Sequence, residues 1–213
     1  MQIERLADLS PVHQRQAAAL ALWRWRAPLL GFGMDADWGV DPNVLVSLFR
    51  LAAEPAGGQS VHAYGQAVAA LSTAPLFESG VDPDTVQLVQ LETIVGLQAF
   101  GELLETPALD AVERVVELSS GLACYLDSLV EGSFYAHPSE EAHSQYLADR
   151  TSGEGYFASR NFAVESACHG TLRSLPDSEG LLDSSAGRAL LARCQDFGEE
   201  LAATLRWLRA TGY

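Results

Sequence analysis

The chain has 213 residues, of which 48% are hydrophobic and 19% charged, and its formal net charge is −15. This composition is typical of a packed globular protein, excludes a disordered chain, and contains no apolar run near the roughly 18 residues of a membrane-spanning helix. A surface so acidic repels phosphate groups, so nucleic acids and anionic membranes are excluded as binding partners.

Helix start signals punctuate the first 75 residues. Ser10 before Pro11, Asp41 before Pro42, and Ser60 each combine a capping side chain with the first turn of an apolar helical pattern. The helices predicted from these signals cover about 11–28, 42–53 and 62–72. Glycines and prolines between them predict loops.

The second part of the chain predicts a helical hairpin. Asp82 and Pro83 open a long apolar helix that reaches Glu105, and Thr106 with Pro107 turns directly into a second helix from 108 to about 130. Two long apolar helices joined by so short a turn pack antiparallel, so we expect the 83–130 hairpin at the structural centre. Further helices are predicted near 139–150, 156–172 and 186–209.

No segment alternates polar and apolar residues long enough to predict a strand. The fold class that the sequence predicts is therefore all-α, a helical bundle of about seven or eight helices. The length suits one hydrophobic core, so we expect residues 1–213 to form a single domain.

The cysteines and the N-terminus predict a cytoplasmic protein. Cys124, Cys168 and Cys194 are odd in number and widely spaced, which is unlike a zinc site or a disulfide framework. Residues 1–6 lack the basic segment and apolar run of a secretory signal. We therefore expect buried, free thiols in a reducing compartment.

The charge is distributed unevenly. Residues 1–75 contain five Arg and six acids, a net of −1, whereas residues 76–213 contain eight Arg and twenty-two acids, a net of −14. Such a surface suits a basic protein partner or solubility alone. Every basic residue is Arg, which fits the codon bias of a GC-rich bacterial genome.

Four residues are candidate metal ligands. Glu140 and His143 are spaced i, i+3, and Glu165 and His169 are spaced i, i+4, so each pair shares one face of its predicted helix. Carboxylate–histidine pairs on facing helices build di-metal sites in helical bundles. Glu92 and Glu117 on the hairpin are candidate extra carboxylates. The alternative interpretation is solvated polar faces near a helix start.

Trp23, Arg24, Trp25 and Arg26 suggest an aromatic and basic patch, but on a helix they spread around its whole circumference. We therefore expect Trp23 in the core and the Arg side chains at the surface, with their stems over apolar groups. The Gly31–Gly33 pair follows a predicted helix instead of a strand, so it does not indicate a nucleotide site.

Three regions resemble a known family. They are Ile3–Leu6 with Gly31–Gly33 and Leu48–Leu51, the hairpin from Leu91 to Tyr125, and Arg193–Leu201 with Leu205–Arg209. In this pattern the chain resembles the YjaG-like bacterial proteins, a domain-of-unknown-function family of helical proteins. The resemblance implies a helical bundle and no particular activity.

Two functional hypotheses follow. The first is a non-enzymatic protein-binding or regulatory module whose acidic surface binds a basic protein. The second is a metal-dependent enzyme that uses Glu140, His143, Glu165 and His169. The first is favoured because no catalytic motif is present, and no cofactor is predicted. The sequence leaves open whether the chain forms a homo-oligomer.

Overall fold

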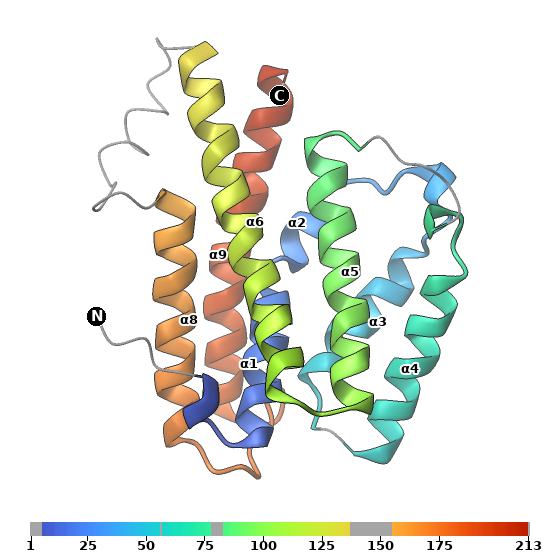
Figure 1. The fold of residues 1–213 in the computed structure, drawn as a ribbon, viewed down its shortest axis with the longest axis vertical. Helices are drawn as coiled ribbons and strands as arrows, with labels where there is room; N and C mark the ends of the chain where they lie inside the picture. Colours follow the sequence, from blue (N-terminus) through green and yellow to red (C-terminus); the bar gives the residue numbers. More distant parts are fainter. Residues whose placement is uncertain (1–5, 56, 78–82, 137–154, 213) are drawn as a thin grey trace.

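The structure is a computed structural model that describes residues 6–55, 57–77, 83–136 and 155–212. These residues form the all-helical bundle that the sequence predicts, with no strand among them (Figure 1). The helices are α1 (Pro11–Trp23), α2 (Arg26–Leu30), α3 (Pro42–Ala53), α4 (Gly58–Ser72), α5 (Thr85–Glu105), α6 (Leu109–Ala136), α8 (Tyr156–Ser174) and α9 (Ser185–Thr211). The helix predicted near 139–150 lies outside the described residues.

Helices α5 and α6 form the predicted antiparallel hairpin, and Figure 1 shows their joining turn at the lower end of the bundle. The α5 helix begins at Thr85 behind a reciprocal cap, slightly later than predicted. The Gln87 backbone N–H donates to Asp84 Oδ1 over 2.7 Å, and the Asp84 N–H donates to Gln87 Oε1 over 2.9 Å. This capping box satisfies two backbone donors that would otherwise lack partners.

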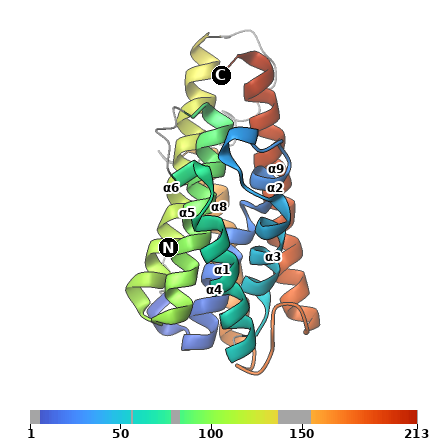
Figure 2. The same ribbon diagram turned by 90° about the vertical axis from the view of Figure 1, so that its right-hand side faces the viewer.

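Helix α1 is the most enclosed element of the bundle. It packs against α3, α5, α6, α8 and α9, and every residue from 16 to 22 is buried. The stretch from Ala17 to Leu22 is apolar on every side, as suits the inside of a protein, and its alanines let the neighbouring helices approach closely. The turned view in Figure 2 shows α1 among the surrounding helices. The predicted hairpin therefore shares the centre of the molecule with α1.

The predicted helix over 11–28 is interrupted, which is a correction to the sequence interpretation. Helix α1 ends at Trp23, and α2 begins at Arg26. Pro28 explains the break, because a proline lacks the N–H that would bond to the carbonyl four residues earlier, and its ring collides with that carbonyl. The residue four positions before Pro28 is Arg24. Its carbonyl is free to face α9 instead, where it lies against Gly198.

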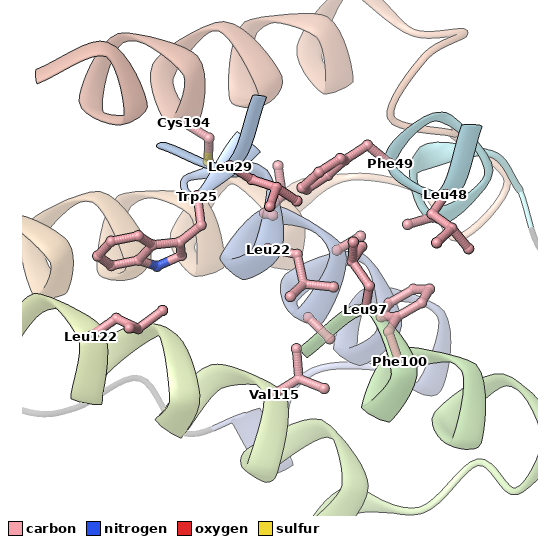
Figure 3. Packing of buried hydrophobic residues seen from close by; sticks show 14 of the residues in the cluster. Leu22, Trp25, Leu29, Leu48, Phe49, Leu97, Phe100, Val115, Leu122 and Cys194 are labelled. Carbon is pink, nitrogen blue, oxygen red and sulfur yellow. The ribbon is translucent and has the colours of Figure 1, made fainter. Parts of the chain in front are cut away.

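The buried hydrophobic side chains form one contiguous cluster that draws on every α helix of the described chain. Figure 3 shows part of it, including Trp25, Leu97 and Phe100. On the α4 side, the buried Tyr64 hydroxyl donates to the Leu97 carbonyl over 2.8 Å, so its one polar group is satisfied inside the core. Burial raises the pKa of Tyr64 well above its ordinary value.

A substitution at Gly198 tests the close approach between α9 and the α1–α2 break. A Cβ atom at Gly198 would lie 2.6 Å from the Arg24 carbonyl oxygen, whereas a Cβ at Gly121 of α6 meets no atom within 4 Å. We expect Gly198→Ala to lower the free energy of unfolding by about 2 kcal/mol, through overpacking against backbone. Gly121→Ala is the matched control and should raise it by about 0.5–1 kcal/mol, since Ala favours a helix more than Gly. Urea denaturation measures both, and equal changes in the two variants would contradict this packing.

Candidate functional site

The side chain of Arg24 turns into the bundle at the α1–α2 break and is 1% exposed. Its Nη1 donates to the Asn161 carbonyl over 3.2 Å, and its Nη2 donates to Glu165 Oε2 over 3.3 Å. Both partners belong to α8. The expectation that this arginine lies at the surface was wrong, because Arg24 lies in the break between α1 and α2 and its side chain points into the bundle. Its charge is balanced by an ion pair with the partly buried Glu165.

A chain of hydrogen bonds continues from this ion pair to α6. The Trp25 indole Nε1 donates to Ser119 Oγ over 2.8 Å, and that hydroxyl donates to Asn161 Oδ1 over 3.4 Å. The Asn161 amide in turn donates to Ser120 Oγ over 3.3 Å. Trp25 and not Trp23 is the fully buried tryptophan, while the half-buried Trp23 lies under the Arg26 guanidinium at 5.4 Å. The network joins the α1–α2 break, α6 and α8.

Two of the three cysteines meet beside this network. Cys168 follows Glu165 by one turn of α8, and its Sγ lies 3.8 Å from Cys194 Sγ of α9. Both thiols are buried, which confirms the expectation for these two, but Cys124 is exposed, so the expectation of three buried thiols was wrong for that residue. The two cysteines are 26 residues apart in the sequence, and nothing in the sequence indicated that they lie side by side.

The two thiols differ in acidity. A hydrogen bond with the Cys194 thiol lowers the pKa of Cys168, and the positive charges of Arg24 and Arg193 act in the same direction. The same hydrogen bond raises the pKa of Cys194, and burial raises it further. The hydrogen bond between the two thiols thus acts in opposite directions on their pKa values, while Arg24 and Arg193 lower both.

The proposed metal ligands are only partly placed. Glu140 and His143 lie outside the described residues. Glu165 forms the ion pair with Arg24, and His169 is 3% exposed on the same helix. Glu92 is half-buried on α5 and Glu117 is exposed on α6. Within the ranges that the structure describes, no three His, Cys, Asp or Glu side chains gather as a metal site would require.

A second feature lies at the α5–α6 turn, at the other end of α1. A pocket of about 420 Å³ opens there, between the first turns of α1 and α4, the end of α5 and the start of α6. Most of its walls are apolar, from Val12, Val61, Leu104, Leu109 and Val112 among others. A concave apolar surface of this size is suited to bind a side chain or a small ligand.

Arg15 lines the pocket as its one charged residue. The side chain is half-buried, and burial lowers the pKa of its guanidinium. Among the described residues it has no carboxylate partner, although acids predominate in this chain. Its N–H donors are therefore available to a carbonyl or carboxylate that enters the pocket.

Acidic side chains crowd the two helix ends that form the pocket. Glu102 and Glu105 end α5, and Asp110, Glu113 and Glu117 lie on the first turns of α6; all five are exposed. Arg114 is the single base in this stretch, and its Nη1 lies 3.0 Å from Glu102 Oε2. The other four carboxylates have no basic partner in the described part of the chain. We call the pocket and these five acids the turn surface.

Comparisons with known proteins identify no relative. No family model matches the chain, and neither the curated proteins nor the solved structures contain a match. No helix of the described ranges is long and apolar enough to cross a membrane.

The ion pair of Arg24 and Glu165 makes a testable contribution to stability. Glu165→Gln leaves a buried guanidinium without its balancing charge, so we expect the free energy of unfolding to fall by about 3 kcal/mol. Arg24→Met is expected to cost less in the Glu165→Gln background than in the wild type, because the uncompensated charge is then gone. Glu102→Gln removes the exposed partner of Arg114 and should change stability by less than about 1 kcal/mol. Urea denaturation measures all four variants, and additive losses would contradict a coupled buried pair.

Proposed function

We propose that this chain is a non-enzymatic protein-binding module, and that it binds a basic protein partner on the turn surface. The observation that carries the proposal is the combination of an apolar pocket of about 420 Å³ with four unpaired exposed carboxylates on the helix ends that form it. Acidic residues alone would fit mere solubility. An apolar pocket among them adds a place where a partner is anchored.

The two parts of the turn surface contribute differently to binding. Carboxylates that stay exposed attract a basic partner from a distance and select against acidic proteins, and they contribute mainly to the association rate. A desolvated apolar pocket holds an anchor side chain and slows dissociation. A basic partner that presents an apolar side chain between its Lys or Arg residues satisfies both parts.

Arg15 gives the same pocket a hydrogen-bond donor that orients the bound segment. An unpaired guanidinium in an apolar setting is costly, and a partner that supplies a carbonyl or carboxylate oxygen removes that cost. The bound segment therefore has an apolar side chain in the pocket and an oxygen acceptor facing Arg15, with its basic residues outside over Glu105, Asp110 and Glu113.

We also propose that this chain is a bacterial, cytoplasmic protein of the YjaG-like family. The family proposal rests on the hairpin and on the short motifs at the two ends of the sequence. The free thiols support a reducing compartment. The family resemblance carries no activity to this chain.

Reversal of charge on the turn surface tests the proposal. The partner is first captured from a lysate of the host with the tagged protein at low salt, identified by mass spectrometry and purified. Its affinity is then measured by calorimetry. Glu105→Lys with Glu113→Lys is expected to weaken binding by at least about tenfold at low salt, and by less at high salt, because screening reduces the contribution of exposed charges.

The control is a matched change in charge elsewhere. Asp37→Lys with Glu199→Lys replaces two exposed acids far from the α5–α6 turn in sequence and should leave the affinity within about twofold of wild type. Equal weakening by both double variants would mean that net charge alone matters. Unchanged affinity in Glu105→Lys with Glu113→Lys would contradict the proposed surface.

Filling the pocket tests its role separately from charge. Ala108 is exposed in the α5–α6 turn and lines the pocket, so Ala108→Trp occupies the space without disturbing a buried residue. We expect a loss of binding of about tenfold or more, caused by faster dissociation and independent of salt. Ala108→Ser is the control and should bind as the wild type does. Surface plasmon resonance gives both rate constants, and tight binding by Ala108→Trp would exclude the pocket as the anchor site.

A further inference from the structure

The Cys168–Cys194 pair lies outside the turn surface, and the proposed function makes no use of it. The two Sγ atoms lie 3.8 Å apart across the contact of α8 with α9. A disulfide has sulfur atoms about 2.05 Å apart, so the two Sγ atoms must move about 1.8 Å closer for the bond to form. Figure 3 shows the Cys194 side chain directed from α9 into the bundle, toward the segment that carries Trp25.

We propose that Cys168 and Cys194 are a modification site, at which a small peroxide oxidises the folded protein to a reversible intramolecular disulfide between α8 and α9. The inference goes beyond the proposed function and does not depend on it.

The hydrogen bond between the two thiols favours one order of events, which variants with a single cysteine test. This bond lowers the pKa of Cys168, whereas the same bond and burial raise the pKa of Cys194, and Arg24 and Arg193 lower both. The thiolate is the nucleophilic form of cysteine. Cys168 therefore attacks the peroxide, and the protonated Cys194 is the resolving thiol.

The reaction balances as two steps. First, the Cys168 thiolate attacks one oxygen of the peroxide, the O–O bond breaks, and Cys168 becomes a sulfenic acid while the other oxygen leaves as water after protonation. Second, the Cys194 sulfur attacks the Cys168 sulfur, the S–O bond breaks, and a second water leaves as the S–S bond forms. Two thiols have then lost two electrons to one hydrogen peroxide, and a thiol reductant reverses the change.

A groove of about 490 Å³ lies on α8 and α9, the two helices that carry the cysteines, although neither cysteine lines it. Four alanines line it, Ala163, Ala167, Ala189 and Ala192, and small side chains leave room for a small oxidant. Ala167 directly precedes Cys168, and Arg193, which also lines the groove, directly precedes Cys194. Each cysteine therefore directly follows a residue of the groove wall, on the same pair of helices.

The test uses the full-length protein with the substitution Cys124→Ser, which removes the exposed thiol and prevents cross-linking between molecules. The reduced protein is treated with hydrogen peroxide under native conditions, remaining thiols are alkylated, and the intact mass and tryptic peptides are measured. The expected product is a monomer that has lost two hydrogen atoms, resists alkylation and contains a peptide linking Cys168 to Cys194. Dithiothreitol should restore both thiols.

Two variants that each keep one cysteine test the assigned order. In Cys124→Ser with Cys194→Ala, the sulfenic acid on Cys168 has no resolving thiol and should be trapped by dimedone. In Cys124→Ser with Cys168→Ala, the protonated, buried Cys194 should give less than about a tenth of that adduct. The crosslinked protein should also melt several degrees higher than the reduced one, because the new bond restricts the unfolded chain.

Three results would overturn the proposal. They are the absence of a crosslink in the folded protein, a crosslink that forms only in urea, and equal dimedone labelling of the two single-cysteine variants. Peptide mapping of the Cys124→Ser protein gives an answer even where a single variant fails to fold.

Discussion

The guanidinium of Arg24 is buried where α1 gives way to α2, and the bundle has to balance its charge from within. Pro28 causes that break, because it has no N–H to donate to the Arg24 carbonyl four residues earlier. The side chain then reaches α8, where Glu165 and the Asn161 carbonyl accept its hydrogen bonds. A buried charge tolerates little displacement of its partners, so this contact fixes α8 against the α1–α2 break. The position of Cys168, one turn after Glu165, follows from the same contact.

Helix α1 connects this network with the turn surface. Arg15 lies on its second turn and Arg24 directly follows its last residue, so about 14 Å of helix rise separates the two arginines. Arg24 is paired inside the bundle and stabilises the fold. Among the described residues Arg15 has no carboxylate partner, and it lines an open pocket, where its donors are available to a ligand or partner. The two arginines thus differ in their surroundings and not in residue type.

Much of the fold could be predicted from the sequence, because the helices here begin at local signals. Ser10 with Pro11 and Asp41 with Pro42 mark the observed starts of α1 and α3, and the α5–α6 hairpin follows from Thr106 and Pro107. The break before Arg26 was predictable as well, from the spacing of Pro28 to Arg24, but the apolar pattern continued across it and concealed it.

The candidate sites could be predicted far less well, because both are assembled from distant segments. Cys168 and Cys194 meet only after α8 and α9 pack, and the pocket needs the first turns of α1 and α4 beside the α5–α6 turn. The excess of acids after residue 75 suggested a surface for a basic partner, which stays a prediction, and it gave no place for that surface. The metal hypothesis relied on spacing along single helices, which does not reveal that Glu165 is engaged by Arg24.

Hydrogen–deuterium exchange of the protein with and without its captured partner tests the central claim most directly, since backbone amides that become buried or ordered exchange more slowly. If the partner binds the turn surface, we expect slower exchange in the complex over residues 102–117 and in the first turns of α1 and α4. Exchange in α8 and α9 should be unchanged. Slower exchange confined to α8 and α9, with the α5–α6 turn unaffected, would show that the partner binds elsewhere and would contradict the account.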